Sequence, residues 1–533
     1  APSSFRITTQ PSAVVAGVSF SPSVALELLD AYSNRVTNNN SFEIRPVFVA
    51  ADDSTSNSAT ATASSGVITF ANLNFTKSGD YRIRFEQVST SPLASVTSSP
   101  FVVSPAAPNS VVWDVAPSDV VARALMTAPR LKVLDRFGNH VENDSATLVT
   151  LQVRNSASST VTPAFATGLS KQAAAGYVTF DNLALGLAAD TYSLRVATAT
   201  NAGTGLAGTV TVSSTQFQIT PGAPHSLQLA TAAAGAAAGA SFTTQPVVRI
   251  LDRDGSLVPS TETITMSVNQ IQTTGSHQVS ASGGVATFQN AGVSGARGNY
   301  LLTFTLTTNG NTITTTQPLV VTSGVASKIE IIDEPTTKKT GSAFTGTAPR
   351  VRLFDSFDNP VTISSGITVR ATLVSSQSAA LPTVTQSSAV TFNSEGIASL
   401  AGFDFVAAPG SYRLEFNASN FAPVTSAPFT VTVADPSILT WQTPPPSSLV
   451  TGITMPTAVL KIEDVYGNLV TGDNSTVVTI TSSNSATLSG ITAVAQGGLV
   501  TFTNFNMIAI PGNYAIKFTA TNPNASSINN ISV

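Results

Sequence analysis

A pattern of alternating apolar residues that ends in an aspartate and a short turn recurs five times along this chain. The clearest copy is PRLKVLDRFGNHV, residues 129–141. The aspartates that end the five copies are Asp30, Asp135, Asp252, Asp355 and Asp464, and subtraction of their numbers gives spacings of 105, 117, 103 and 109 residues. A period of this length fits one small β-sandwich, so the sequence predicts five similar domains in place of one large core.

The predicted domains span residues 1–105, 106–221, 222–323, 324–434 and 435–533. Short segments that contain Pro or Gly connect them, namely SPAAPNS, TPGAPHS, TSGVAS and VADPS. Such linkers allow less reorientation than a long Gly/Ser tether, so we expect an elongated and semi-rigid rod. Strands of about ten residues would give domains about 35–40 Å long and a rod on the order of 150–200 Å.

Two further markers follow the turn in each period. The first is Gly-x-x-x-Phe, found at residues 66–70, 176–180, 284–288 and 498–502, whereas the fourth period has GIASL ending at Leu400. The second is a tyrosine that follows a short turn, at Tyr81, Tyr192, Tyr300, Tyr412 and Tyr514. A tyrosine at the start of a strand matches the tyrosine corner of immunoglobulin-like sandwiches, so we assign these five residues a structural role.

The position two residues after each tyrosine is aliphatic: Ile83, Leu194, Leu302, Leu414 and Ile516. Antibody domains have a disulfide cysteine at this position, and this chain contains no cysteine. About seven strand-like segments occur in each period, and helical periodicity is nowhere sustained. The predicted fold is therefore all-β, with five tandem immunoglobulin-like β-sandwich domains in an elongated rod.

The order of the three markers resembles that of the bacterial immunoglobulin-like tandem repeats of large surface and secreted proteins, of the invasin and intimin type. The markers are L-x-D-x-x-G-N-x-V, G-V-x-T-F and G-x-Y-x-L, with the departures DRDGS in the third period and DSFDN in the fourth. This resemblance implies a stalk, a spacer, an adhesin shaft or a building block of a surface layer or fibre. It implies an extracellular or cell-surface location.

The composition excludes some classes of partner. Charged residues make up 10% of the chain and the formal net charge is -4, so no basic face for nucleic acid is expected. The sequence contains no stretch of 18 consecutive apolar residues, so no membrane-spanning helix is predicted. The chain opens at Ala1 without the features of a secretory signal, which fits either a processed chain or a piece of a longer protein.

The five signature aspartates are the candidate metal ligands. Calcium prefers carboxylate and carbonyl oxygens, often in turns rich in Asp, Asn and Gly. However, one aspartate in each turn does not supply the several anionic ligands of a tight site, and an Asx turn explains Asp, Gly and Asn without a metal. We therefore prefer the turn interpretation, and expect no cofactor other than this calcium candidate.

No catalytic constellation is expected. The three histidines, His140, His225 and His277, fall in a turn, a linker and a loop, and carboxylate pairs do not recur.

Other residues that could suggest a site have simpler interpretations. The adjacent Lys338 and Lys339 are predicted to be a solvated loop pair, and Glu142 and Asp144 are predicted to be exposed carboxylates. The alanine-rich run at residues 230–240 predicts a local spacer. Trp113 and Trp441 occupy one strand position in two periods, which favours packing over a sugar platform.

The sequence thus predicts a non-catalytic extracellular structural protein, a stiff rod that forms or extends a cell-surface fibre, stalk or layer. Few charges are available to protect sheet edges, so self-association or association with neighbouring repeats is expected. The alternative is an adhesin whose loops or terminal domain recognise a host protein or glycan. An inserted, aromatic-rich loop in one period would favour this alternative, and the sequence has none, although the second period is the longest, with extra residues around 156–171.

Overall fold

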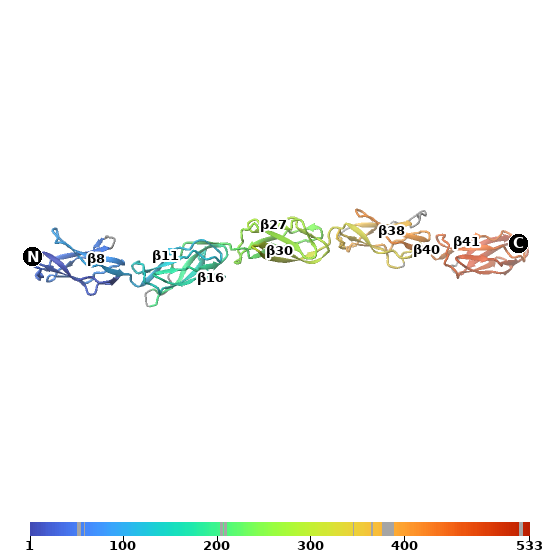
Figure 1. The fold of residues 1–533 in the computed structure, drawn as a ribbon. Helices are drawn as coiled ribbons and strands as arrows, with labels where there is room; N and C mark the ends of the chain where they lie inside the picture. The colour runs from blue at the N-terminus through green and yellow to red at the C-terminus, as the bar shows by residue number, and fades with distance from the viewer. Residues whose placement is uncertain are drawn as a thin grey trace.

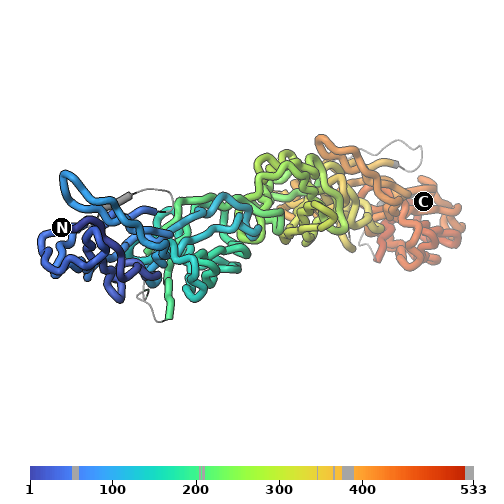
Figure 2. Tube along the Cα trace, turned by 60° about the vertical axis from the view of Figure 1, so that its left-hand side comes forward, coloured from blue at the N-terminus to red at the C-terminus, as the bar shows by residue number. Residues whose placement is uncertain are grey.

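The computed structural model describes residues 1–50, 55–57, 59–202, 206, 211–344, 346–363, 366–375, 389–521 and 526–532. All regular elements in these ranges are β-strands, β1 to β49, so the all-β prediction is confirmed. Within the same ranges, no helix has the length and apolar content needed to cross a bilayer. The five periods, called repeats one to five below, follow one another end to end, with the termini at opposite ends (Figures 1 and 2).

Repeat two shows how each repeat is built from facing sheets. Its first sheet has the order β11 (Pro108–Val115), β13 (Arg130–Asp135) and β18 (Tyr177–Thr179). Its second sheet has the order β12 (Val120–Val121), β21 (Phe217–Thr220), β20 (Asp190–Thr200), β14 (Leu148–Asn155) and β15 (Thr160–Val161). β17 (Ser170–Gln172) also pairs with β14, and β16 (Phe165–Thr167) pairs with β19 (Ala184–Gly186) in a third, two-stranded sheet.

Repeats one and four have the same two facing sheets. The strands of repeat one are β1 (Ser4–Thr9), β3 (Val24–Leu29) and β7 (Val67–Phe70) in one sheet, and β2 (Val14–Val15), β10 (Phe101–Ser104), β8 (Gly79–Gln87), β4 (Glu43–Ala50), β5 (Thr55–Asn57), β6 (Ala61–Thr62) and β9 (Val96–Thr97) in the other. Those of repeat four are β32 (Lys328–Asp333), β34 (Arg350–Phe354) and β37 (Ile397–Ser399), and β33 (Lys338–Lys339), β40 (Phe429–Thr432), β38 (Gly410–Ala418), β35 (Thr368–Ser375), β36 (Ala389–Thr391) and β39 (Val424–Thr425).

Repeats three and five, like repeat two, divide their strands into three sheets. In repeat three these are β22 (Ser226–Thr231), β24 (Val247–Leu251) and β28 (Val285–Thr287); β23 (Ala240–Ser241), β29 (Gly292–Ser294) and β26 (Gln272–Thr274); and β27 (Gln278–Ser280), β25 (Thr263–Val268), β30 (Gly298–Thr308) and β31 (Asn311–Val321). In repeat five they are β41 (Pro436–Thr443), β42 (Ala458–Asp464) and β46 (Leu499–Phe502); β45 (Thr492–Val494), β43 (Val477–Ser482), β48 (Asn513–Ala520) and β49 (Ser526–Ser532); and β44 (Thr487–Ser489) and β47 (Asn506–Ile508).

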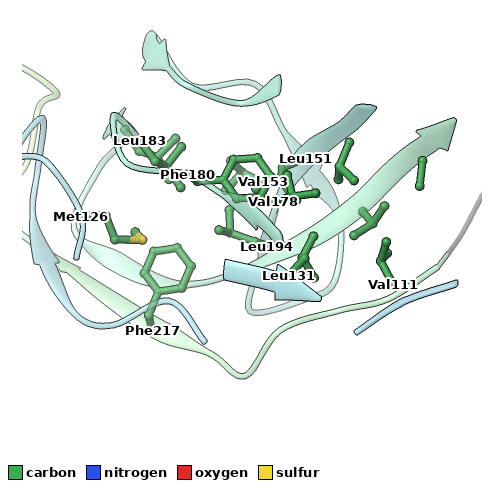
Figure 3. Packing of buried hydrophobic residues seen from close by; sticks show 14 of the residues in the cluster. Val111, Met126, Leu131, Leu151, Val153, Val178, Phe180, Leu183, Leu194 and Phe217 are labelled. Carbon is green, nitrogen blue, oxygen red and sulfur yellow. The ribbon is translucent and has the colours of Figure 1, made fainter. Parts of the chain in front are cut away.

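The strands form because their apolar residues alternate with the period of an extended chain. In β13, Leu131, Val133 and Asp135 point inward and are buried, while the residues between them are half-buried. Each repeat encloses its own cluster of buried hydrophobic side chains. Figure 3 shows this cluster in repeat two, where Leu131 and Val178 of one sheet lie close to Leu151 and Leu194 of the other.

The spacer interpretation of the alanine-rich run is wrong. Ala233, Ala236 and Ala238 are buried in the core of repeat three. Ala237 forms a parallel bridge with Thr322, at the edge where β2 and β12 pair in repeats one and two. Alanine is small enough to let this segment lie close to the sheet, so the run is an edge segment that helps to close the core.

Candidate functional site at the joints between repeats

The recurrent aspartate organises a five-residue signature turn, at residues 30–34, 135–139, 252–256, 355–359 and 464–468. In repeat two, Oδ1 of Asp135 accepts hydrogen bonds from the N–H groups of Phe137, at 2.8 Å, and Asn139, at 2.9 Å. The other four repeats have the same pair of bonds. The fourth residue of every turn is left-handed, including Ser33 at φ 67° and Asp358 at φ 63°. Each carboxylate therefore fixes its own turn.

The second carboxylate oxygen fixes the linker to the preceding repeat. Oδ2 of Asp135 accepts from the N–H of Ala106 at 2.8 Å. Asp252, Asp355 and Asp464 bind Gly222, Gly324 and Ala434 in the same way, at 2.8, 2.7 and 2.9 Å. These four aspartates are at most 2% exposed. The linkers are thus hydrogen-bonded to the downstream repeat.

The last residue of the signature turn reaches the preceding repeat directly. Asn139 donates from Nδ2 to the carbonyl of Thr76, at 2.7 Å, and accepts at Oδ1 from the N–H of Ser78, at 2.9 Å. Asn359 makes the same two bonds, to Gly295 at 3.0 Å and from Arg297 at 2.6 Å. We call each such contact region between consecutive repeats a joint.

The second and fourth joints differ in this bond. Ser256 replaces the asparagine in repeat three, and its Oγ accepts from the N–H of Ala189 at 2.6 Å. At the fourth joint the position of Ser78 is occupied by Pro409, which has no N–H to donate. Asn468 there binds Asp464 of its own turn, at 3.0 and 3.2 Å.

A second contact at the joints involves a left-handed residue of the upstream repeat. This residue is Gly17, Arg123, Gly239 and Gly341 in repeats one to four, with φ between 66° and 81°. The ring of the third residue of the next signature turn covers three of them: Phe137 covers Gly17, Phe357 covers Gly239 and Tyr466 covers Gly341. A Cβ atom on any of these glycines would overlap the ring, so glycine here permits the close approach of the downstream domain.

The second joint replaces the glycine and the ring by an ion pair. Arg123 donates from Nε to Oδ2 of Asp254, at 2.8 Å, and from Nη2 to Oδ1, at 2.7 Å. The Asp254 side chain is 3% exposed. The hydrogen bonding of Arg123 to the Asp254 carboxylate is the main cause that raises the pKa of Arg123. A two-pronged pair of this kind fixes orientation as well as distance.

The hydrogen bonds of the signature turn also control the protonation of the carboxylates. Burial alone would raise the pKa of Asp135, but hydrogen bonds from Asn139, Ala106 and Phe137 outweigh it and lower the pKa. The same balance lowers the pKa of Asp355 and Asp464. The pKa of Asp30 is lowered chiefly by its hydrogen bond from the backbone of Asn34. These carboxylates are therefore held in their charged form.

The five aspartates lie in five separate turns, and the structure does not bring them together. Each of the four downstream carboxylates has hydrogen bonds at both oxygens, from its turn and from its linker. In the part of the chain that the structure describes, no three His, Asp or Glu side chains form a group that could hold a metal ion. Calcium at these turns stays the untested alternative to the turn interpretation.

In repeats two and three, the recurrent tyrosine binds the loop that contacts the next repeat. The hydroxyls of Tyr192, Tyr300, Tyr412 and Tyr514 donate to the carbonyl four residues upstream, at 2.7–2.9 Å. Tyr81 is buried in the core of repeat one, where its ring packs against Phe75 and Phe101. The hydroxyl bond of Tyr192 fixes the loop that carries Ala188, which is next to Ala189 of the second joint.

Two predictions about pairs of surface charges are each wrong for one residue, Lys338 and Asp144, whereas Lys339 is exposed as predicted. Lys338 is wholly buried in repeat four, where Nζ donates to Oδ1 of Asp404 at 2.9 Å and lies 3.9 Å from the centre of the Phe405 ring. Burial lowers the pKa of Lys338. Asp144 is also buried, and its Oδ1 accepts hydrogen bonds from the Asn201 side chain, at 2.9 Å, and from the N–H of Ala146. Glu142 is exposed, as predicted.

The two tryptophans pack against the cores of their own repeats. Trp113 lies against the cluster of repeat two, and the Trp441 ring meets Phe518 edge-on at 4.8 Å in repeat five. The rings of His140 and Tyr177 in repeat two are tilted against each other, with their centres 4.4 Å apart, and His140 is far in sequence from His225 and His277. None of these residues forms a joint contact of the kind described above.

The role of the joint residues was not recognised from the sequence, although a signal was present. The third residue of the signature turn is aromatic in four repeats and is Asp254 in the remaining one. The repeat before it is the one in which an arginine, Arg123, replaces the left-handed glycine. This paired exception within one chain could have indicated that the two positions meet.

No family model and no curated protein matches this chain. Among solved structures, domains 1–6 of the surface layer protein SbsC are 14% identical with a TM-score of 0.22, over 95% of this chain and 65% of that one. A tetra-tandem repeat from the extending region of a large adhesion protein is 13% identical with a TM-score of 0.27, over 79% and 100%. Cadherin domains 1–5 of protocadherin gamma B2 are 12% identical with a TM-score of 0.29, over 92% and 93%.

Proposed function

We propose that this chain is a non-catalytic extracellular structural protein, a stiff rod of immunoglobulin-like sandwiches that forms or extends a cell-surface fibre, stalk or layer. The main observation in favour is the repeated joint. At each of the four joints, the signature turn of one repeat binds the linker and contacts the end of the previous repeat. The same polar residues that could suggest a ligand site are thus occupied in connecting domains.

The joints favour stiffness because they restrict the linker and both of its neighbours. The connections from the last strand of one repeat to the first strand of the next are short, at residues 105–107, 221–225, 322–327 and 433–435. One linker N–H in each is bound to a buried aspartate. Bending at a joint would have to break these buried hydrogen bonds, which are costly to leave unmade.

The immunoglobulin-like assignment is supported by the strand order. In repeat two, β11, β13 and β18 form one sheet, and β14, β20 and β21 lie side by side in the facing sheet. This order matches the A-B-E and C-F-G sheets of immunoglobulin folds. The tyrosine at the start of β20 is placed as in the tyrosine corner of that fold.

Small-angle scattering and negative-stain imaging of the full chain test the rod. We expect a maximum dimension on the order of 150–200 Å and a narrow distribution of angles between consecutive repeats. A much smaller dimension, or angles spread as widely as those of Gly/Ser-linked domains, would contradict a stiff rod. Antibody labelling and protease treatment of intact producing cells test the surface location, and protection of the chain inside intact cells would contradict it.

A further inference from the structure

Repeat four has a lysine and an aspartate at two positions where the other repeats have uncharged residues. Lys338 lies three residues before the left-handed joint residue Gly341. Asp404 precedes Phe405, whose carbonyl accepts from the N–H of Gly341 at 3.0 Å. The corresponding pairs in the other repeats are Val14 and Asn74, Val120 and Ala184, Ala236 and Gly292, and Leu449 and Asn506. The two charged residues therefore occur together, in the same repeat.

The position of Lys338 belongs to the core of the sandwich. Its counterparts Val14 and Val120 pack against the cores of repeats one and two, and the Lys338 side chain itself is 0% exposed. Nζ lies 3.9 Å from the centre of the Phe405 ring and 5.3 Å from that of Phe344. The amine is thus shielded from water, and a charge held in such a place is costly.

The Asp404 carboxylate meets this amine with an oxygen that a backbone N–H also binds. Oδ1 of Asp404 accepts from Nζ of Lys338, at 2.9 Å, and from the N–H of Phe405, at 2.7 Å. The nitrogen is held beside the carboxyl carbon, which replaces a bimolecular encounter by a preformed one. The N–H on Oδ1 stabilises the negative charge that develops there when a nucleophile adds to the carbon. The Asp404 side chain is 42% exposed, so water released from it can leave.

We propose that Lys338 and Asp404 form an intramolecular amide bond, a covalent crosslink between β33 and the loop after β37. The bond from Nζ to Cγ forms, and the bond from Cγ to one carboxylate oxygen breaks. Of the three ammonium protons, two leave with that oxygen as water and one stays on the amide nitrogen. The remaining oxygen becomes the amide carbonyl and keeps the hydrogen bond from Phe405. Both charges disappear, which removes the cost of burying an ammonium.

Burial of Lys338 favours the reactive form of its amine. The neutral amine has the lone pair that attacks the carboxyl carbon. Burial lowers the pKa of Lys338, against the opposing effect of Asp404, so the neutral form is reached more readily than on an exposed lysine. The next residue provides the contrast. Nζ of Lys339 contacts Oδ1 of Asp435 at 2.6 Å, but these side chains are 47% and 82% exposed, and this solvated pair should stay ionic.

The crosslink strengthens the end of repeat four that carries the fourth joint. β33 leads to Gly341, which Tyr466 covers, and the loop from Asp404 leads to Pro409. A covalent bond between these two segments keeps them together when the rod is pulled. The inference goes beyond the proposed rod function and does not depend on it, because the bond forms within repeat four.

The intact mass of the full chain, measured under denaturing conditions, tests the bond. We expect a mass below that of the sequence by one water molecule, in fresh protein or after incubation of the folded chain at neutral pH. Lys338→Met should have its full sequence mass, whereas the matched control Lys339→Met should still lack one water. A cyclic imide at residues 254–255, an Asp-Gly step, would remove the same mass, so peptides must locate the link. Digestion should give one branched peptide that contains Lys338 and Asp404, with no tryptic cleavage after Lys338.

Two results would overturn the proposal. One is the full sequence mass of the folded chain before and after incubation, with Lys338 and Asp404 in separate linear peptides. The other is a water loss that maps only to other residues, or that persists in Lys338→Met. Because peptides of the unaltered chain locate the bond, the test does not depend on the folding of a variant. A stiff rod without the mass loss would leave the proposed function in place, and a flexible chain with the mass loss would contradict that function alone.

Discussion

At the scale of single residues, the signature aspartate acts as a structural connector. In repeat two, the carboxylate of Asp135 accepts from three backbone N–H groups, one of which belongs to the linker residue Ala106. It also accepts from the Asn139 side chain, which in turn contacts repeat one. One buried carboxylate thus joins the turn, the linker and the neighbouring repeat.

Asp135→Ala tests this role. The substitution leaves three N–H groups without their acceptor, and each buried unsatisfied donor costs about 1–3 kcal/mol. We expect a loss of several kcal/mol in the stability of repeat two, measured by chemical denaturation, and the same response to calcium and to a chelator as in the parent chain. The control is Asp30→Ala, whose half-exposed carboxylate has no linker bond, and it should cost less. A calcium-dependent stabilisation that Asp135→Ala abolishes would instead establish a metal site.

The lowered pKa values predict how stability depends on pH. The pKa values of Asp135, Asp355 and Asp464 are lowered in the folded chain, because their hydrogen bonds outweigh burial. Their contribution is fully present above the unfolded pKa of about 3.9 and is lost as the pH falls through the lower folded value. We expect the free energy of unfolding to decrease below about pH 4. Asp135→Asn should make that decrease shallower, and an unchanged slope would contradict this assignment.

At the scale of strands, one exchange explains the repeat that departs from the Gly-x-x-x-Phe marker. Repeats one and two place Phe70 with Leu73, and Phe180 with Leu183, in their cores. Repeat four has Leu400 and Phe403 at these positions, both 1% exposed. The large and the medium side chain have exchanged places, so the volume of the core is conserved.

This exchange predicts a compensating double mutant. Leu400→Phe alone places two large rings in one core and should destabilise repeat four by about 1–3 kcal/mol. Leu400→Phe with Phe403→Leu restores the arrangement of repeat two and should recover most of that loss, with a coupling measurable in a double-mutant cycle. Additive effects of the two substitutions in thermal denaturation would show that these positions do not share volume.

The sequence predicted the regular elements better than the contacts between them. Alternation identified β13 and its counterparts because one face of each strand must be buried. It failed for Lys338, because the burial of an ammonium depends on Asp404 and Phe405, which are distant in sequence. The contact of Asn139 with the preceding repeat was also missed. The sequence of a turn does not distinguish an asparagine that binds its own turn from one that binds Thr76 of another repeat.

At the scale of the whole molecule, the four joints share a geometry but not a chemistry. The first, third and fourth cover a glycine with an aromatic ring, whereas the second holds Arg123 against Asp254. An ion pair depends on both partners, because removal of one leaves the other charge, the half-buried Arg123 or the buried Asp254, without compensation. The second joint is therefore the one whose orientation a single charge substitution should disturb.

Asp254→Ala is expected to widen the distribution of angles between repeats two and three in negative-stain images, while the third joint stays unchanged as an internal control. The double substitution Arg123→Gly with Asp254→Phe installs the glycine and ring of the first joint, and should restore a narrow distribution. An unaltered angle in Asp254→Ala would show that the ion pair does not hold this joint.

The ion pair of the second joint also has a consequence for how such a chain can be rearranged during evolution. A glycine in one repeat accommodates the ring of any repeat that presents one, so repeats with these residues are interchangeable neighbours. Repeat three is different. If it followed a repeat with the joint glycine in place of Arg123, its Asp254 would lack a cation. Duplication or deletion of modules should therefore keep repeats two and three together as a pair, while the others can be gained, lost or reordered.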